Sequence, residues 1–288
     1  MQPSRNDVLE AVLGAHQLQV SIIDAPEYCG TWFEDEKATP EGSFHLIDSG
    51  ACIVRCAMFD SPLRLATGDL VVFPRGAAHT LSNDPAQATP DGGFSTLICG
   101  VLEFPDAQRN PVLQALPEAF VIRAEAAGSA FRDLAKVLGF AARSGMPGQR
   151  VIMNKLADSL FVMAVCVYAA QEKNPAGLFA ALSDMRLARV LAAIHGEPGK
   201  PWRIDSMAAL AGMSRTAFAD AFTGLLGIGP FQYLTEWRIT EAQRLLRDRQ
   251  ISVASVAERL GYQSEAAFRR TYKRVTGVGP GQTRRRPS

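Results

Sequence analysis

Two short segments near the C-terminus place polar and charged side chains at matched positions. The first segment offers five candidate contact residues: Arg215, Thr216, Ala219, Asp220 and Thr223. The second segment, fifty residues further on, offers six: Gln263, Ser264, Glu265, Arg269, Arg270 and Lys273. Arginine can bond to guanine and glutamine to adenine through paired hydrogen bonds, whereas lysine suits phosphates, which give affinity without sequence information. The residue types therefore predict contacts with the bases and the backbone of double-stranded DNA.

A repeat with a period of fifty residues and no gap predicts the elements that position these side chains. Seven of the 21 paired positions between residues 210–230 and 260–280 are identical, where chance gives about one or two. Gly212 can end one helix and Ser214 can cap the next, and Gly261 and Ser264 repeat the pair. Each copy is predicted to be a helix-turn-helix unit whose second helix enters the DNA major groove. A merely solvated charged face is the alternative, and the second copy disfavours it.

One long amphipathic helix is predicted between the two copies. Pro230 is a favourable first helical residue, and apolar residues recur at helical spacing over residues 231–249. A rigid helix would fix the distance between the two major-groove helices. If both enter adjacent grooves on one face of the DNA, they should lie about 34 Å apart, or about 10 base pairs.

Five stretches of this region resemble the AraC/XylS family of bacterial transcription regulators: Trp202–Ala208, Met213–Phe218, Trp237–Ile239, Ala242–Leu246 and Ala257–Phe268. The resemblance covers about residues 183–283 and implies a DNA-binding domain of seven helices with two helix-turn-helix units. It also implies contact with RNA polymerase, with activation and repression both open. Asp220 departs from the family, which often has Arg or Lys there, so the first copy is expected to make fewer phosphate contacts.

The charges separate along the chain although the net charge is only +1. Residues 1–177 carry 13 Lys and Arg against 20 Asp and Glu, a net charge of −7, whereas residues 178–288 carry 17 against 9, a net charge of +8. The cut falls at residues 171–177, a polar run with Pro and Gly that is predicted to be a linker. The near-neutral total therefore conceals a basic segment suited to a polyanion.

The N-terminal segment has the pattern of a small β-sandwich or barrel. Apolar runs between Gly, Pro, Asp and Asn predict strands over Val20–Ile23, Phe44–Ile47, Cys52–Val54, Leu70–Phe73 and Phe94–Leu102. After about residue 128 the spacing becomes helical. The helix over about residues 150–171 is apolar nearly all round its second half, which predicts burial on more than one side, within its own domain or at a subunit interface.

Residues 68–83 resemble the second cupin motif, G-x5-P-x-G-x2-H-x3-N, at every fixed position. A cupin is a small β-barrel that often holds a metal or a small ligand, and the resemblance implies a ligand role for His79. The first cupin motif should add two histidines and a glutamate, but only His45 stands there. An intact catalytic metal site is therefore not expected. A zinc site of His45, His79 and a cysteine, and plain hydrogen-bonded barrel histidines, are the alternatives.

The cysteines raise the alternative of a redox sensor. The segment around Cys99 looks like the corresponding stretch in oxidant-sensing members of this group, and Cys29 lies in a loop-like run as a possible partner. Cys52 and Cys56 are four residues apart, which on a strand means about 13 Å and excludes a disulfide without rearrangement. Buried, inert thiols are the simpler interpretation. Cys166 is expected in the core of its helix.

Together these patterns predict an α+β protein. An N-terminal cupin-like β-barrel plus helices precedes an all-α C-terminal domain with two helix-turn-helix units joined by a long helix. We expect a sensor domain over residues 1–105, a helical linker that also dimerises over residues 106–176, and the DNA-binding domain over residues 183–283. The expected partners are double-stranded DNA, RNA polymerase, a second copy of the chain, and a small-molecule or oxidant effector near His45, His79 and Cys99.

Other classes of protein are disfavoured by composition. The N-terminus lacks the apolar core of a signal peptide, and the longest apolar run, residues 160–170, is shorter than the roughly 20 residues of a membrane span. A cytoplasmic protein without membrane contact, cofactor, metal or catalytic residue is expected. The alternatives are a metal-dependent cupin enzyme with an accessory helical domain, a cysteine-based redox-sensing regulator, and a helical interaction module that does not bind DNA.

Overall fold

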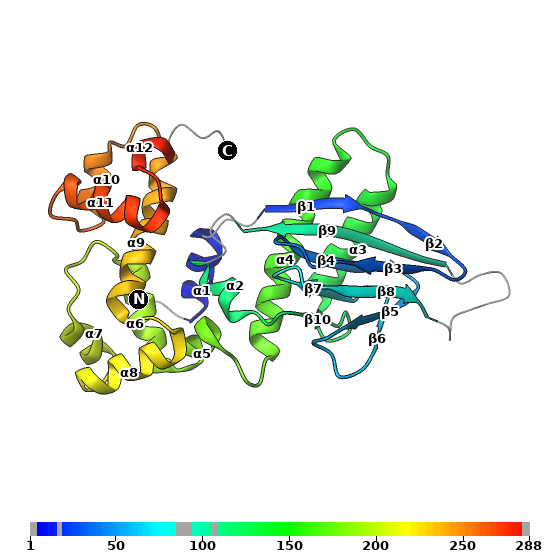
Figure 1. Cartoon of the computed structure of the whole chain (residues 1–288), viewed down its shortest axis with the longest axis horizontal. Coiled ribbons are helices and arrows are strands. Elements are labelled where there is room, and N and C mark those ends of the chain that lie inside the picture. Colours follow the sequence, from blue (N-terminus) through cyan, green and yellow to red (C-terminus); the bar gives the residue numbers. More distant parts are fainter. Residues whose placement is uncertain (1–4, 16–18, 85–93, 105–108, 284–288) are drawn as a thin grey trace. The chain divides into compact units, whose positions relative to one another are not determined.

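The computed structural model describes residues 5–15, 19–84, 94–104 and 109–283 of the 288-residue chain (Figure 1). They form two compact units whose segments alternate along the sequence. The strand-rich unit draws on residues 17–107 and 116–173, and the helical unit on residues 1–16, 108–115 and 174–288. The predicted domain boundaries near residues 105, 176 and 183 stay predictions, because compactness alone does not define folding domains.

Two antiparallel sheets build the strand-rich unit. The larger sheet has the order β1-β9-β4-β7-β10, with β2 also paired to β9, and the smaller has the order β3-β8-β5-β6. The strands are β1 (Gln19–Asp24), β2 (Glu27–Cys29), β3 (Phe33–Glu36), β4 (Gly42–Ser49), β5 (Ala51–Cys56), β6 (Leu63–Ala66), β7 (Leu70–Phe73), β8 (His79–Asn83), β9 (Phe94–Glu103) and β10 (Phe120–Ile122). Apolar side chains from both sheets share one core, which includes Ile47, Val54, Phe73 and Leu97.

The structure confirms the α+β class and all five predicted strands. The remaining strands are short, and β3 is exposed along its whole length, so an apolar pattern could not reveal them. Strand β10 pairs with β7, with Phe120 opposite Val72. The segment over residues 106–176 is therefore not wholly helical, which corrects that part of the prediction.

Helices α3 (Ser129–Arg143) and α4 (Gln149–Gln171) complete the strand-rich unit. On α4, the Asp158 carboxylate accepts a hydrogen bond from the Val20 amide at 2.8 Å, and the Asn154 carbonyl accepts one from the Ile22 amide at 3.0 Å. These bonds satisfy amide groups of β1, an edge strand of the larger sheet. By length and composition alone α4 could cross a membrane. Its polar bonds to a sheet are instead typical of a core helix.

Within the single chain only one side of α4 is buried, so the predicted burial of a further side at a subunit interface stays a prediction. The expected position of Cys166 is wrong. Met153, Ala157, Leu160 and Phe161 are among its buried residues, whereas Val151 is 66% exposed. Cys166 is exposed rather than in the helix core. On the neighbouring helix α3, Phe140 is 65% exposed. Both helices therefore leave apolar side chains open to solvent.

The helical unit contains ten helices within the described residues. They are α1 (Arg5–Ala15), α2 (Pro111–Ala115), α5 (Gly177–Ser183), α6 (Met185–Gly196), α7 (Ile204–Ala211), α8 (Arg215–Leu226), α9 (Pro230–Leu246), α10 (Val253–Arg259), α11 (Glu265–Thr276) and α12 (Pro280–Thr283). Helices α1 and α2 come from the N-terminal part of the sequence, yet α1 packs on α6 and α2 packs on α5. Val8 and Val12 of α1 are fully covered by this packing.

The predicted repeat is present in the structure. Helices α8 and α11 have twelve residues each, begin after the caps Ser214 and Ser264, and end at Gly227 and Gly277 with φ of 72° and 77°. Their buried ring pairs, Phe218 with Phe222 and Phe268 with Tyr272, share a centroid distance of 5.5 Å and an interplanar angle of 59°. The same sequence pattern thus produces the same local packing twice.

The first helix of each copy departs from the fifty-residue period. Gly212 and Gly261 are both left-handed and close the first helix, but they are 49 residues apart. The turn of the second copy is therefore one residue longer, with Tyr262 and Gln263 between Gly261 and Ser264. The prediction of a repeat without a gap is wrong at this turn, although it is correct from the serine caps onward.

Helix α9 joins the copies and fixes the loop before α7 against the second turn. It starts at Pro230 as predicted, and its Arg238 guanidinium donates to the carbonyl oxygens of Pro198 at 2.7 Å and Lys200 at 3.0 Å. The same guanidinium lies over the Tyr262 ring. A Cβ atom on Gly261 would lie 2.2 Å from the Gly199 oxygen, so only glycine permits this close backbone contact.

Candidate nucleic-acid interface and sensor site

The outward faces of α8 and α11 carry the predicted contact residues. Nine of the eleven are exposed: Arg215, Thr216, Asp220, Thr223, Gln263, Ser264, Arg269, Arg270 and Lys273. Ala219 and Glu265 are half-buried. The fully buried rings on the opposite faces fix the rotation of each helix. The sequence repeat thus leads to two exposed polar helix faces of the kind that can enter a major groove.

The two helix faces differ in charge. Helix α8 carries Arg215 and Asp220 and has no net charge, whereas α11 carries four basic residues against Glu265, a net charge of +3. Two of the arginines already have acidic partners, since Arg215 forms an ion pair with Asp205 of α7 and Arg269 bonds to Glu265 at 2.6 Å. Positive charge is therefore concentrated on the second copy.

Ser264 has the structural role of a helix cap, as its place in the repeat predicts. Its hydroxyl oxygen accepts a hydrogen bond from the Ala267 amide at 3.2 Å and caps α11. The hydroxyl hydrogen remains able to donate to a DNA phosphate, so capping and DNA contact are compatible.

In the strand-rich unit, His45, His79 and Cys99 lie together although they are far apart in sequence. His45 on β4 stands opposite Cys99 on β9 in the larger sheet, and His79 belongs to β8 of the smaller sheet. The His45 Nε2 and His79 Nε2 atoms are 2.7 Å apart, and the His45 Nδ1 atom lies 3.1 Å from the Cys99 Sγ atom. The three side chains thus connect the two sheets through the interior.

The direction of each hydrogen bond in this chain follows from one carbonyl group. The His79 Nδ1 atom lies 2.8 Å from the Ala77 oxygen, which can only accept, so Nδ1 carries the proton. In neutral His79 the Nε2 atom must then accept from His45 Nε2–H. His45 Nδ1 is left as an acceptor, and the Cys99 thiol donates to it. The result is an ordered series from Cys99 through His45 and His79 to the Ala77 carbonyl.

All three side chains are uncharged near neutral pH. Burial, together with the neighbouring His79, lowers the pKa of His45 to about 3. Burial also lowers the pKa of His79, against the opposing effect of its bond to the Ala77 carbonyl. Burial and then the charge of Glu36 raise the pKa of Cys99 to about 12. The resting state is therefore a neutral thiol beside two neutral imidazoles.

This geometry does not suit a metal ion. His45 directs one ring nitrogen to His79 and the other, on the opposite side of the ring, to Cys99. The three donors therefore do not converge on one point, as a tetrahedral or octahedral metal requires. Among the described residues, no group of three or more His, Cys, Asp or Glu is arranged to hold a metal ion.

Cys29 is not a disulfide partner for Cys99 in this fold, which corrects the pairing considered above. Cys29 on β2 stands opposite Phe94, and Cys99 lies five residues further along the same strand β9. Five strand residues span roughly 17 Å, far beyond the about 7 Å that a disulfide permits between Cα atoms. Joining these thiols requires a large rearrangement of the sheet edge.

Comparison with known families agrees with both halves of this description. Residues 7–170, more than half of the chain, match the cupin family, and residues 207–286 match a helix-turn-helix domain family. The helix-turn-helix match begins inside α7 and covers both copies of the repeat.

Relatives among known transcription regulators cover most of the chain. The HTH-type transcriptional regulator MtrA of Neisseria gonorrhoeae is 28% identical over 97% of this chain and 98% of its own length. The RCS-specific HTH-type transcriptional activator RclR of Escherichia coli K12 is 29% identical over 77% of each chain. Among solved structures, the DNA-binding domain of AdpA in complex with a target DNA is 36% identical over 34% of this chain and 88% of that chain, with a TM-score of 0.33.

These relatives are transcription regulators and not enzymes, which removes the cupin enzyme and the interaction module without DNA binding as interpretations. The duplicated helix-turn-helix geometry, the cupin match and the full-length relatives lead to one conclusion: the chain belongs to the AraC family of DNA-binding transcription regulators and carries a cupin domain ahead of its helix-turn-helix domain.

Proposed function

We propose that this regulator reads its operator through α8 and α11, with the eleven residues named above as the contact surface. The observation that carries the proposal is the duplication of cap, ring pair and glycine end in two helices whose polar faces are exposed. Gln263 and Arg269 are assigned to base edges because their side chains can form paired hydrogen bonds with adenine and guanine. Arg270 and Lys273 are assigned to phosphates.

The effector is proposed to act at the His45–His79–Cys99 site. An effector can shift the regulator only through a different affinity for the DNA-binding and non-binding states. The site offers a thiol and two imidazoles, and the buried Phe73 ring stacks on His79 at 3.7 Å. A small polar molecule that replaces the His45–His79 hydrogen bond would separate the two sheets locally, and this is the change we assign to the effector.

Oxidation of Cys99 is a second candidate for the signal, favoured by the hydrogen bond from its thiol to His45 Nδ1. Transfer of the thiol proton to Nδ1 would produce the thiolate, which is the nucleophilic form. With a peroxide as the oxidant, the sulfur would attack one oxygen and the O–O bond would break, which gives a sulfenic acid. The departing oxygen would take the proton from His45 Nδ1 and leave as water or an alcohol. The high pKa of Cys99 makes this reaction slow unless the site first opens.

We further propose a cytoplasmic homodimer that contacts RNA polymerase when bound to DNA. The support for the dimer is the exposed apolar surface of α3 and α4, which includes Val137, Phe140, Val151 and Val162. Exposed apolar side chains gathered on two packed helices are typical of a protein interface. A dimer would double the number of helices in contact with the operator.

Genome-wide mapping of bound DNA with the full chain tests the operator proposal. We expect discrete sites with a shared sequence, and we expect Gln263→Ala and Arg269→Ala to lose most of them. Arg55→Ala removes an exposed charge from β5, outside both proposed surfaces, and serves as the control that retains them. An unchanged binding map for both α11 variants would overturn the assignment of this surface.

Mapping of bound DNA with and without the signal, in two further variants, separates a small-molecule effector from an oxidant. A small-molecule effector should fail in His45→Gln and still act in Cys99→Ser, because serine retains the donor to His45. An oxidant should lose its effect in Cys99→Ser. A normal response in both variants would exclude this site as the sensor.

A further inference from the structure

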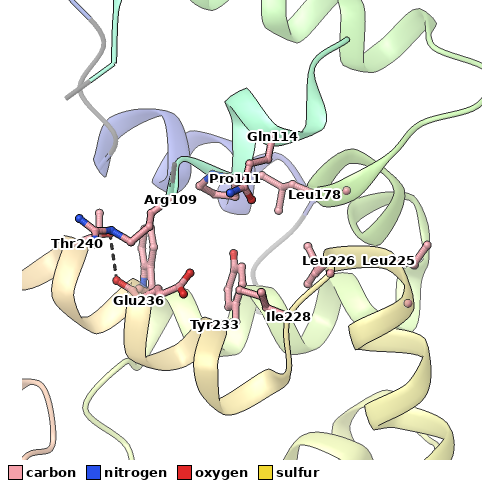
Figure 2. Close-up of a pocket in the computed structure, with 14 residues that line it drawn as sticks. Arg109, Pro111, Gln114, Leu178, Leu225, Leu226, Ile228, Tyr233, Glu236 and Thr240 are labelled. Atoms are coloured by element: carbon pink, nitrogen blue, oxygen red, sulfur yellow. Dashed lines mark hydrogen bonds between the residues drawn. The ribbon is translucent and has the colours of Figure 1, made fainter. Parts of the chain in front are cut away.

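A cavity of about 280 Å³ lies in the helical unit, whereas the sensor site belongs to the strand-rich unit. Its walls are formed by α2, the start of α5, the end of α8 and the middle of α9 (Figure 2). Tyr233 and Glu236 project from α9 toward Pro111, Gln114 and Leu178 on the opposite side. The cavity therefore has one wall from the first helix-turn-helix copy and one from a segment that interrupts the cupin domain.

Gly224 on the wall of this cavity has no apparent role in folding. It lies in the last turn of α8, where glycine lowers helix stability, and the left-handed end of the helix is already supplied by Gly227. A Cβ atom on Gly224 would meet no other atom within 4 Å. Neither the backbone nor the packing thus requires glycine here, whereas an open cavity benefits from the missing side chain.

The second copy of the repeat provides an internal comparison. The residue fifty positions after Gly224 is Arg274, an exposed long side chain in the matching turn of α11. The helix length, cap and ring geometry are the same in both copies. The helix-turn-helix fold therefore accepts a long side chain at this position, and the glycine is specific to the copy that lines the cavity.

The aromatic wall of the cavity is ordered by contacts with His195 on α6. The Tyr233 hydroxyl and the His195 Nε2 atom are 2.8 Å apart, and the His195 ring stacks on Trp237 at 3.9 Å. Both Tyr233 and Trp237 are almost fully buried. Since His195 holds both side chains in place, the aromatic wall is preformed, as is usual for small-molecule sites.

The lining indicates the chemical class of ligand. It combines aromatic and aliphatic side chains with one cation, Arg109, and one anion, Glu236. Opposite charges leave the cavity without a net charge, so a charged ligand would find as much repulsion as attraction. An apolar ring can pack on Trp237 and Ile228, while a single hydroxyl or N–H group can donate to Glu236.

We propose that this cavity is a second ligand site, within the helical unit, for a small uncharged aromatic molecule with one hydrogen-bond donor. The proposal does not rest on the His45–His79–Cys99 site. A ligand here would touch α2 and the turn between α8 and α9 at once.

Calorimetric titration of the full chain with indole tests the proposal. We expect saturable binding of one indole per chain and at least tenfold weaker binding of indole-3-carboxylate, which carries a negative charge. Gly224→Leu should fill the cavity and weaken indole binding at least tenfold. Gly224→Ala should change the affinity less than threefold, because its single methyl group meets open space.

Ile228→Trp fills the same cavity from another wall and should weaken binding as Gly224→Leu does, with thermal unfolding confirming that each variant is folded. Absence of saturable indole binding would overturn the proposal. So would unchanged affinity in both filling variants, which would locate the indole elsewhere. Tighter binding of the carboxylate than of indole would overturn the proposed class of ligand.

Discussion

At the scale of single residues, the Ala77 carbonyl determines where the protons of the sensor site lie. It requires the proton of His79 to be on Nδ1. This in turn determines which atoms of His45 and Cys99 donate and which accept. The sequence identified all three side chains as candidates. It could not predict their order, because that order depends on the register of β4 with β9 and on the approach of the second sheet, which are non-local features.

The neutral, buried His45 makes stability depend on pH. Between about pH 6.5 and pH 3 the unfolded chain binds a proton at His45 that the folded chain does not, so the free energy of unfolding falls as the pH falls. The contribution of one such group is at most about 1.4 kcal/mol per pH unit. Urea unfolding at pH 7, 6 and 5 should show a shallower pH dependence in His45→Gln than in the wild type. Equal slopes would contradict the neutral, buried state of His45.

Single substitutions on α11 should separate base contacts from phosphate contacts. Gln263→Ala is expected to relax the preference at one operator position, by about 1–3 kcal/mol. Lys273→Ala should weaken all sequences equally and reduce the slope of log affinity against log salt by about 0.9. Fluorescence anisotropy with operator variants at several salt concentrations measures both effects. The same response from the two variants would argue against the separate roles.

At the scale of elements, the repeat could be predicted from the sequence because caps and glycines mark where its helices begin and end. Ser214, Ser264 and Pro230 begin helices as their types predict, because the signals act within a few residues. Strand β3 and helix α1 were missed, since their positions follow from packing on other elements. The extra residue in the second turn was missed because the identity of Leu210 and Leu260 supported a spacing of fifty before the turn, whereas the structurally equivalent Gly212 and Gly261 are 49 residues apart.

Glycine substitutions in the two copies should have opposite effects on stability. Gly261→Ala is expected to destabilise by at least about 1–2 kcal/mol, because φ is +75° and the new methyl group would overlap the Gly199 oxygen. Gly224→Ala is the matched control and should gain up to about 0.5–1 kcal/mol of helix stability. The shift of the urea midpoint measures both. A stable Gly261→Ala protein would contradict the close contact between the loop and the second turn.

At the scale of the whole molecule, the separated charges indicate that the parts of the chain have different partners. The net charge of +8 over residues 178–288 favours contact with DNA, while the net charge of −7 over residues 1–177 disfavours it. The alternation of the compact units along the chain was not predictable from composition. The short helix α2 sits between two strands of the cupin sheet in sequence but packs in the helical unit, and only tertiary contacts reveal this.

The proposed dimer surface can be tested with a matched pair of phenylalanines. Phe140 on α3 is 65% exposed and Phe33 on β3 is 63% exposed. A change to aspartate therefore removes a similar exposed apolar surface at each position. Phe140→Asp should shift the protein from dimer to monomer in light scattering, whereas Phe33→Asp should remain a dimer. In a Cys29→Ser background, a bismaleimide should crosslink the exposed Cys166 only in the dimer. A dimeric Phe140→Asp protein would exclude α3 from the interface.

Hydroxyl-radical footprinting of one protomer's operator half-site tests the central claim most directly, that α8 and α11 both read the major groove. We predict two protected windows about 10 base pairs apart on one face of the DNA. Substituting Arg215 and Thr216 by alanine should remove one window, and substituting Gln263 and Arg269 should remove the other. A single window, or two windows that do not respond separately to these substitutions, would contradict the account.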